Sequence, residues 1–458
     1  MIHRIARLTL AAALGAAPLV AQTPPPPAPP AAPASPEKLE QRVRILERKL
    51  ELAEEQKTEK EKSAAVVAVG AEGFTLKSAQ GDYQLRLRAL VQTDGRFFTG
   101  DAERPLTDTF VVRRARPILE GALGKRVEFR LMPDFGAGTS TLADAYFDVR
   151  IAAPVKLRIG KAKVPVGLEA LLEDANLPFV ERGLPSNLAP VRDVGVQATG
   201  EPLGGRLVYA LGVFNGVPDA GSGDGDNGDD KDWAARLFFR PFQRPAAAAP
   251  ARVGLGLGMA ASVGRQSGSA SAPNLPVYRS PGLQTVFSYR SDGTAAGTAI
   301  AAGDRTRLAP QGWLYTGPFL VFAEWTESRQ RVASGAVNAD LAHRAWQLSA
   351  TWAVTGEPIS ERGLVPRRPF DPASGGHGAL LVSARYGVLE VDDAAFPVHA
   401  DPAKSVRRAA DAGASLGWLL NRNVKFVLDY QQTAFDGGAV GGDRPTEKAL
   451  LVRAQLAF

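Results

Sequence analysis

Residues 83–92 read Tyr-Gln-Leu-Arg-Leu-Arg-Ala-Leu-Val-Gln, and apolar and polar side chains alternate through most of this stretch. In an extended strand, successive side chains point to opposite faces. Leu85 and Leu87 therefore lie on one face, and Arg86 and Arg88 lie on the other. A strand with one apolar and one charged face predicts a position between two different solvents.

The same alternation recurs to the end of the chain. Roughly sixteen segments show it, and most approach the ~9–11 residues that a tilted membrane strand needs. Clear examples are residues 127–134, 144–149, 232–240, 346–352 and 424–431. The pattern predicts an all-β fold: a transmembrane antiparallel β-barrel of about 16 strands.

Connections between these segments fall into two kinds. Very short turns are expected at residues 121–124, 201–205 and 421–423. Long polar loops are expected at residues 220–231, 267–280 and 392–404. One end with short turns and another with long loops is typical of outer-membrane barrels.

Aromatic residues distinguish this barrel from a soluble β-sandwich or propeller, whose strands also alternate. Several fall on the apolar faces: Trp233, Trp325, Trp346, Trp352, Trp418, Tyr209 and Tyr430. An aromatic girdle at a membrane surface requires this placement. The final segment also alternates from Leu450 to Phe458, and a terminal Phe of this kind resembles the assembly signal of outer-membrane proteins. Such a strand must pair with the first one to remove both sheet edges.

The first 63 residues divide into three expected parts. Residues 1–21 have the basic start, apolar centre and small final residue of a cleaved signal peptide. Residues 22–36 form a Pro/Ala-rich linker. Residues 37–62 predict a short coiled-coil helix, because Leu39, Val43, Leu46, Leu50 and Ala53 alternate spacings of four and three. The alternative is a lone solvated helix. Residues 64–458 are then the barrel, exported to the outer membrane of a Gram-negative bacterium.

Composition excludes several classes of chemistry. The chain has no cysteine, so thiolate zinc sites, Fe–S clusters and Cys nucleophiles are excluded. A net charge of +6 without a Lys/Arg block argues against nucleic acid. The run Asp224–Asp230 lacks the glutamate that closes a calcium loop, which favours a solvated loop over a metal site. We expect no cofactor, no metal and no enzymatic activity, since no G-x-S-x-G or H-E-x-x-H motif occurs.

Four blocks of sequence carry a resemblance to a known family. They are residues 110–121, 158–200, 352–386 and 421–430. The second contains Gly160-Lys161, Val164-Pro165-Val166-Gly167 and Arg192-Asp193-Val194-Gly195. In this order the blocks resemble the phosphate-selective porin O/P family, in which a strand runs into an inward-folded constriction loop. The resemblance implies a pore for small anions, phosphate among them, in a trimer surrounded by outer-membrane lipid.

Basic side chains on inward faces and near the constriction loop are the candidate pore-lining, anion-binding residues. They are Arg86, Arg88, Arg114, Arg116, Arg130, Lys161, Lys163, Arg182 and Arg192. A cation in the lumen replaces part of an anion's hydration, and Arg can bind phosphate oxygens bidentately.

Other interpretations remain open. Each candidate can instead pair with a nearby carboxylate, because Glu120, Glu128, Asp134, Asp144 and Asp148 lie close in the pattern and the constriction segment is itself acidic. The pore can therefore be a general one, or the barrel a structural one tethered through its coiled coil.

Overall fold

The computed structural model describes residues 35–70, 73–100, 106–226, 228–243 and 253–458. Contacts divide the chain into two units, residues 1–62 and 63–458. The predicted signal peptide and most of the predicted linker lie outside the described residues. In the first unit, α1 spans Pro36–Ser63. Leu39, Leu46 and Leu50 are exposed along it, so the predicted coiled-coil seam is not covered by any part of the chain that the structure describes. No helix among the described residues is long and apolar enough to span a membrane.

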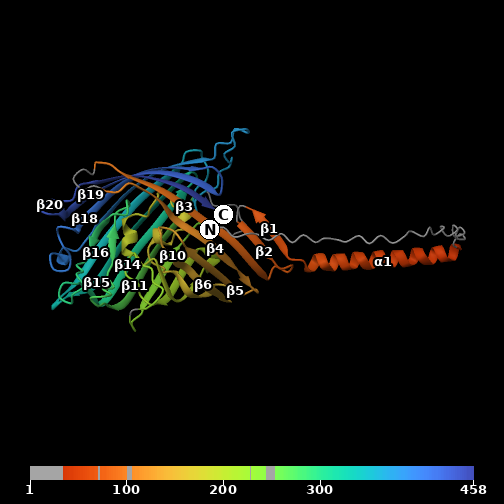
Figure 1. Cartoon of the computed structure of the whole chain (residues 1–458), viewed down its shortest axis with the longest axis horizontal. Helices are drawn as coiled ribbons and strands as arrows, with labels where there is room; N and C mark the ends of the chain where they lie inside the picture. Colours follow the sequence, from red (N-terminus) through yellow and green to blue (C-terminus); the bar gives the residue numbers. More distant parts are fainter. Residues whose placement is uncertain (1–34, 71–72, 101–105, 227, 244–252) are drawn as a thin grey trace, which may run out of the picture. The chain divides into compact units, whose positions relative to one another are not determined.

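The second unit is a closed antiparallel barrel, as predicted. One sheet contains nineteen of the described strands, and sixteen of these close the barrel through pairing of the last with the first (Figure 1). The sixteen are β3 (Tyr83–Phe98), β4 (Thr109–Leu123), β5 (Val127–Asp134), β6 (Thr141–Ala152), β7 (Val155–Lys163), β8 (Arg192–Gly200), β9 (Leu207–Phe214), β10 (Asp232–Phe239), β11 (Val253–Ser267), β14 (Ile300–Thr316), β15 (Phe319–Ser334), β16 (Val337–Ala353), β17 (Ala379–Glu390), β18 (Val406–Leu419), β19 (Val424–Ala439) and β21 (Glu447–Ala457).

A small hairpin precedes the barrel. Its strands are β1 (Val66–Gly70) and β2 (Gly73–Lys77), and β2 pairs with the first residues of β3. Strand β21 pairs with the later part of β3. The hairpin and the last strand therefore share one edge of β3, and the rings of Phe74 and Phe458 meet edge to face at 6.1 Å.

The two ends of the barrel carry different connections. The turn end has the tight connections 124–126, 153–154, 317–318 and 420–423, and the loop end has the long connections 164–191, 215–231, 268–299 and 391–405. The turn predicted at 121–124 lies instead at 124–126, because β4 continues to Leu123. The long connection 354–378 also belongs to the turn end, so the two ends differ less than the sequence indicated.

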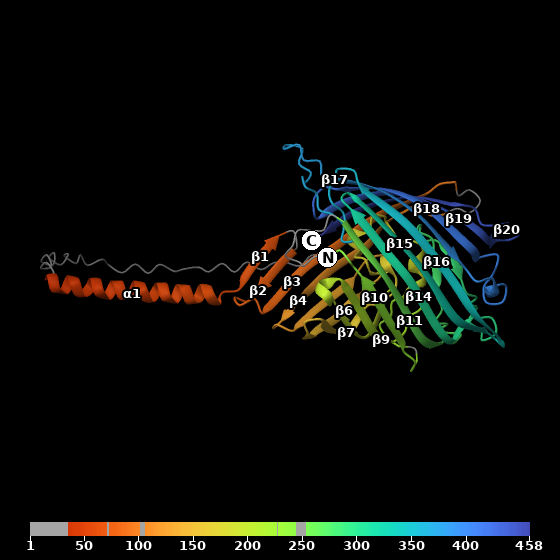
Figure 2. The ribbon, with the colours of Figure 1, turned by 180° about the vertical axis from the view of Figure 1, so that it is seen from behind.

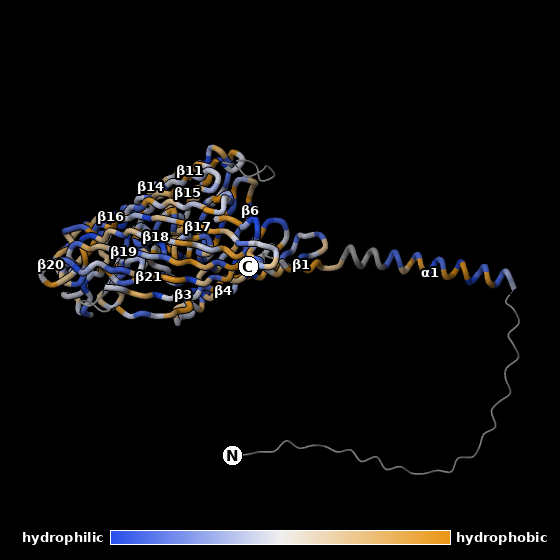
Figure 3. The backbone as a smooth tube through the Cα atoms, turned by 90° about the horizontal axis from the view of Figure 1, so that it is seen from above, coloured by the Kyte–Doolittle hydropathy of each residue, from blue (hydrophilic) through white to orange (hydrophobic). Residues whose placement is uncertain are grey.

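Strand residues alternate between an apolar outer face and a polar inner face. Figure 3 shows the alternation as changes of colour along the strands. On β16, for example, Trp346, Leu348 and Trp352 are exposed on the outside, and Gln347 and Ser349 are buried inside. Outward Leu, Val and aromatic side chains cover neighbouring strands in the same way, as a lipid-facing surface requires. The long strands β14, β15 and β16 lie side by side in Figure 2.

The connection between β7 and β8, residues 164–191, folds into the lumen. It contains α2 (Leu168–Leu171) and the 3₁₀ turns Asp174–Asn176 and Leu184–Leu188. Most of its residues are buried. We call it the constriction loop.

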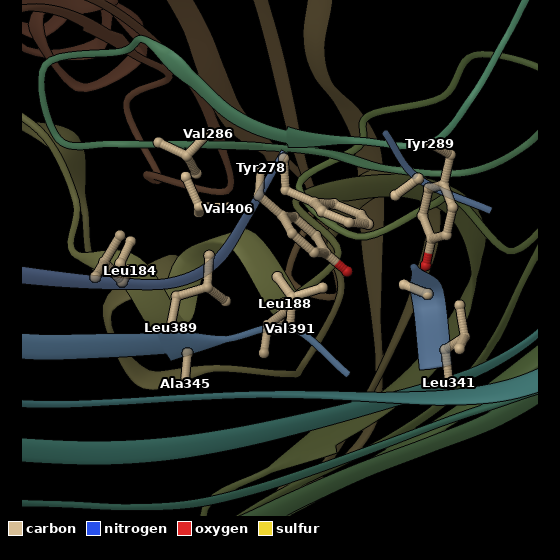
Figure 4. Packing of buried hydrophobic residues seen from close by; sticks show 14 of the residues in the cluster. Leu184, Leu188, Tyr278, Val286, Tyr289, Leu341, Ala345, Leu389, Val391 and Val406 are labelled. Atoms are coloured by element: carbon tan, nitrogen blue, oxygen red, sulfur yellow. The ribbon is translucent and has the colours of Figure 1, made fainter. Parts of the chain in front are cut away.

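An apolar cluster fills part of the lumen at the loop end. Leu184 and Leu188 of the constriction loop pack against Tyr278, Phe287 and other side chains of connection 268–299. That connection forms its own hairpin, β12 (Val277–Arg279) and β13 (Thr285–Ser288). Figure 4 shows side chains from the loops and from the wall strands meeting in this cluster. The sequence interpretation treated residues 267–280 and 392–404 as polar loops and did not foresee it.

Two further apolar clusters lie toward the turn end. In one, Leu168 packs with the inward rings of Phe238, Trp313 and Phe322. A Cβ at Gly256 would lie 2.4 Å from the Phe238 ring and 2.5 Å from Trp313, so glycine on β11 makes room for these rings. In the other cluster, residues 359 and 364 of connection 354–378 pack on wall residues of β16, β17 and β18. We call the part of the barrel formed by β9–β19, whose lumen contains these apolar clusters, the filled half. The part formed by β3–β8 is the charged half.

Candidate functional site

Asp174 is the point at which the constriction loop is held to the charged half. Its carboxylate contacts Arg116, Arg114 at 3.2 Å and Arg182 at 2.6 Å, and its carbonyl accepts a hydrogen bond from Gln92. Burial by itself raises the pKa of Asp174, but the three guanidinium groups hold it well below its ordinary value. The carboxylate therefore stays ionised, and the three arginines remain paired with it.

A second carboxylate of the loop is held in the same way. Glu181 is bound by Arg113 through two hydrogen bonds of 2.6 and 3.3 Å, and Arg453 and Arg96 lie 3.4 and 3.6 Å away. Burial opposes ionisation here too, yet Arg113, Arg114 and Arg453 lower the pKa of Glu181 well below its usual range. Arg453 comes from the last strand, so this cluster also ties the closing seam of the barrel to the loop.

Other parts of the loop are bound to strands of the filled half. Glu324 of β15 accepts hydrogen bonds from the Leu168 and Glu169 amides. On β19, Lys425 donates to two loop carbonyls and Asp429 accepts from the Val180 amide. Toward β5 the described contact is a longer ion pair of 3.8 Å between Arg130 and Glu173. Among the described contacts, the loop is thus held least firmly on the side of the charged half that β5 and β6 form.

Basic side chains lie close to the loop on this side. Arg130 and Arg192 both contact Asp144, at 3.2 and 2.7 Å. Lys163, at the end of β7, donates to the carbonyls of Leu171 and Leu172. The structure therefore brings Arg130, Lys163, Arg182 and Arg192 together around the loop, with Arg114 and Arg116 behind them. Each of these arginines has a carboxylate partner.

Arg86 and Arg88 lie in a different environment, below the loop toward the turn end. Arg86 borders a hollow of about 390 Å³ on the wall β3–β7, which it lines together with Arg130, Lys156, Arg158 and acidic residues. Arg86 and Arg88 both approach the carboxylate of Glu120, at 3.5 and 3.4 Å, and Arg130 lies 3.6 Å from it while also contacting Asp144. Two guanidinium groups that share one carboxylate leave an excess of positive charge. The side chains of Arg86 and Arg88 are each 34% exposed, so this charge faces the lumen.

Lys161 lies apart from the inward row. The register places it opposite Ala145 and Val194, out of phase with Arg158, and its ammonium group contacts Asp224 at 2.5 Å. In the same acidic loop, Asp226 pairs with Lys231 at 2.5 Å. Lysines thus contact two carboxylates of the Asp-rich run. Among the described residues, no group of three or more His, Asp or Glu side chains is placed to hold a metal ion.

Sequence reasoning missed several basic residues of the lumen. Arg113 was not among the predicted pore-lining residues, whereas its neighbours Arg114 and Arg116 were. A shift of register opposite Gln92 and Thr93 leaves Arg113 as an extra residue and turns it toward Glu181. Arg158 was quoted only as part of a motif, although its inward position follows from the alternation. It pairs with Asp148 at 2.7 Å.

An antiparallel barrel that is apolar outside, charged inside and narrowed by an inward-folded loop is a porin of the Gram-negative outer membrane, a channel for small solutes. The chain belongs to the family of phosphate-selective porins O and P, which it matches over residues 84–458. The turn end therefore faces the periplasm and the loop end faces the exterior.

Solved structures share the fold at low sequence identity. An anion-selective porin from Comamonas acidovorans is 12% identical, with a TM-score of 0.51 over 82% of this chain and 100% of that one. The outer-membrane channel DcaP of Acinetobacter baumannii is 13% identical, with a TM-score of 0.50 over 84% and 99%. OmpT of Vibrio cholerae is 10% identical, with a TM-score of 0.51 over 82% and 98%. The comparison with curated proteins gives no match.

Proposed function

We propose that this porin passes small anions along its charged half, and that Arg86 and Arg88 at the periplasmic end of this half set the preference for anions. The observation that carries the proposal is that Arg86 and Arg88 share the carboxylate of Glu120, which Arg130 also approaches. An excess of partly exposed guanidinium groups lowers the cost of an anion leaving bulk water.

The arginines at the constriction loop contribute less to this preference. Arg114 and Arg116 are almost fully buried and held by Asp174. Their charge is largely neutralised at short range, so a passing anion meets an ion pair rather than a free cation. Arg130, Lys163 and Arg192 lie beside the loop on the charged half and form the second stage of the proposed route. Lys161, bound to Asp224, belongs to the external entrance.

Phosphate is the finer proposal. Arg86 and Arg88 project from alternate positions of one strand toward the same carboxylate, so two guanidinium groups can bind one tetrahedral oxyanion. The general, weakly selective pore is the alternative. It is supported by the nearby carboxylates Glu128 and Asp148, which lower the net charge of the hollow.

Bilayer recordings with the purified full chain test both levels. We expect Arg86→Gln/Arg88→Gln to lower the anion-to-cation permeability ratio, measured from reversal potentials, by roughly twofold or more. The matched control is Arg407→Gln/Lys448→Gln, which removes two exposed basic groups at the loop end and should leave the ratio unchanged. An unchanged ratio in the first variant contradicts the proposed role. Failure of phosphate to block chloride current in the unmodified protein contradicts phosphate binding and leaves the general pore.

The chain is further proposed to act as a channel without catalytic activity. A Ser–His hydrogen bond does occur, 2.9 Å between Ser334 Oγ and His399 Nδ1, but both residues are buried at the loop end. A substrate cannot reach them without opening the surrounding loops. Hydrolysis of a panel of ester and peptide substrates that Ser334→Ala abolishes would contradict this.

We also propose an oligomer, a trimer by family resemblance. The exposed leucines of α1, Leu39, Leu46 and Leu50, offer a seam for helices of other copies. Removing residues 37–62 should then weaken the oligomer in native mass spectrometry without preventing barrel formation.

A further inference from the structure

The outer wall of the barrel carries an apolar groove on β11, β14, β15 and β16. Its volume is about 630 Å³, within the range of about 300–1,000 Å³ that is usual for small-molecule sites. Small residues deepen it, since Gly312 and Ala323 are register partners on adjacent strands. Trp325 and Trp346, also register partners, line its end toward the exterior.

The groove lies at the height of the lipid acyl chains. Phe319 and Trp352 face each other across β15 and β16 near the turn end, and their rings stack at 6.0 Å. Trp325 lies six positions beyond Phe319, about 20 Å along the strand at ~3.3 Å per residue, or roughly 15 Å of height at the ~35–45° tilt of such strands. Both aromatic rows therefore fit within the ~25 Å expected for the apolar surface of such barrels, and the groove lies between them.

Immediately beyond the outer aromatic row, the wall becomes basic. Glu327 follows Trp325 by two residues, and it accepts hydrogen bonds of 2.6 Å from both Arg329 and Arg344. The carboxylate is only 12% exposed, whereas Arg329 is 61% and Arg344 is 49% exposed. One largely buried carboxylate thus fixes two guanidinium groups that point away from the wall.

Further acidic and basic residues surround this pair. Glu390 lies opposite Arg344 in the register and opposite Arg408 on its other side, and Arg408 also contacts Asp436 at 3.6 Å. Asp340 contacts Arg331, one step farther from the membrane, at 3.8 Å. The pair Arg329 and Arg344 therefore remains the basic feature nearest to the groove.

We propose that this groove and the Arg329–Arg344 pair bind one phosphorylated lipid of the outer leaflet, with an acyl chain in the groove and a phosphate on the two guanidinium groups. Charge and polarity both change at the aromatic row, apolar below and basic above. This order matches a lipid whose acyl chains lead up to a phosphate-bearing head group, such as the lipid A part of lipopolysaccharide. Arg pairs suit phosphate oxygens because each guanidinium can donate two parallel hydrogen bonds.

Native mass spectrometry of the purified full chain with added lipid A tests the proposal. Because each Arg near an anionic lipid surface contributes about 1 kcal/mol, Arg329→Gln/Arg344→Gln should lower the bound fraction at sub-saturating lipid by roughly tenfold or more. Ala323→Leu should also weaken binding by filling the groove without changing charge. The control Arg407→Gln/Lys448→Gln removes as many basic groups elsewhere at the loop end, and it should bind lipid A normally.

Two further arms identify the ligand. Lipid A without its phosphates should bind the unmodified protein as weakly as lipid A binds the double arginine variant, and inorganic phosphate should not displace bound lipid A. Equal binding of lipid A by all variants overturns the proposal. Displacement by inorganic phosphate shows a free-anion site instead, and loss of the oligomer in Ala323→Leu with unchanged lipid binding shows a surface for a second copy. Pore conductance should be the same in all these variants, because none of the residues faces the lumen.

Discussion

The two halves of the lumen use the same strand geometry for opposite purposes. In the charged half, inward positions of β3–β8 carry arginines, lysines and carboxylates that line a hollow. In the filled half, connections from both ends of the barrel fold inward and bury apolar side chains such as Phe287 and Ile359 against the wall. The constriction loop joins the two, with ion pairs on one side and apolar packing on the other. A sixteen-stranded barrel thus becomes a narrow route along one wall.

The largest expected effect comes from truncating a buried aromatic side chain of the filled half. Phe287 is fully buried between Tyr278, at a ring distance of 5.4 Å, and Tyr289, at 4.9 Å. Phe287→Ala should destabilise this cluster by about 3–5 kcal/mol, the usual cost of truncating a buried Phe. Connection 268–299 should then become sensitive to protease, and pore conductance should rise as the loops loosen. Phe239→Ala, on the exposed outer face, is the control and should change neither. Unaltered protease resistance in Phe287→Ala would show that the cluster does not hold the loops.

Breaking the charged anchor of the constriction loop should have the next largest effect. Asp174→Asn leaves Arg114 and Arg182 without their nearest carboxylate, while Arg116 keeps Asp134, and removing one partner of a buried ion pair costs about 3–5 kcal/mol. Part of this is relieved here because the loop can move toward water. We expect noisier single-channel currents and a higher anion-to-cation permeability ratio. The matched control is Glu173→Gln, because this neighbouring side chain is exposed and makes one long ion pair. Equal behaviour of the two variants contradicts the anchoring role.

The barrel itself was predictable because its cause is local. Period two along each strand places apolar side chains in lipid, and this repeats often enough to give the strand number. The inward positions of Arg86, Arg88 and Arg130 follow from the same rule. Arg113 was not predictable, because one extra residue in β4 reverses its side and leaves no mark in the alternation.

The filled half could not be predicted from the sequence for a different reason. Tyr278 and Phe287 lie in a connection whose composition is that of a solvated loop, and their partners are far away in the sequence. The link between Glu181 and Arg453 spans 272 residues. Such pairings depend on the closed barrel and have no short-range pattern.

A smaller effect should follow from adding a side chain to the wall of the filled half. A Cβ at Gly256 would lie 2.4 Å from the Phe238 ring and 2.5 Å from the Trp313 ring, which is too close for atoms that are not bonded, so the rings must shift. Overpacking of this kind typically costs 1–3 kcal/mol, roughly, and Gly256→Val should lower the unfolding midpoint in urea accordingly. Gly225→Ala serves as the control, since nothing lies within 4 Å of the added Cβ. Equal midpoints for the two variants contradict the close packing of rings on β11.

The smallest expected effect is that of moderate acid on the constriction loop. The folded-state pKa values of Asp174 and Glu181 lie below their ordinary values of 3.8 and 4.5. A carboxyl group with a depressed pKa stabilises the fold fully above its unfolded pKa, and this contribution is lost only as the pH falls through the lower, folded value. Both carboxylates are therefore ionised in the folded and in the unfolded chain between pH 7 and pH 5. The differences in single-channel conductance and current noise between the unmodified protein and Asp174→Asn should therefore be the same at pH 7 and at pH 5. A transition with a midpoint between pH 5 and pH 7 would mean that a different titrating group controls the loop, and the test is whether Asp174→Asn leaves that midpoint in place.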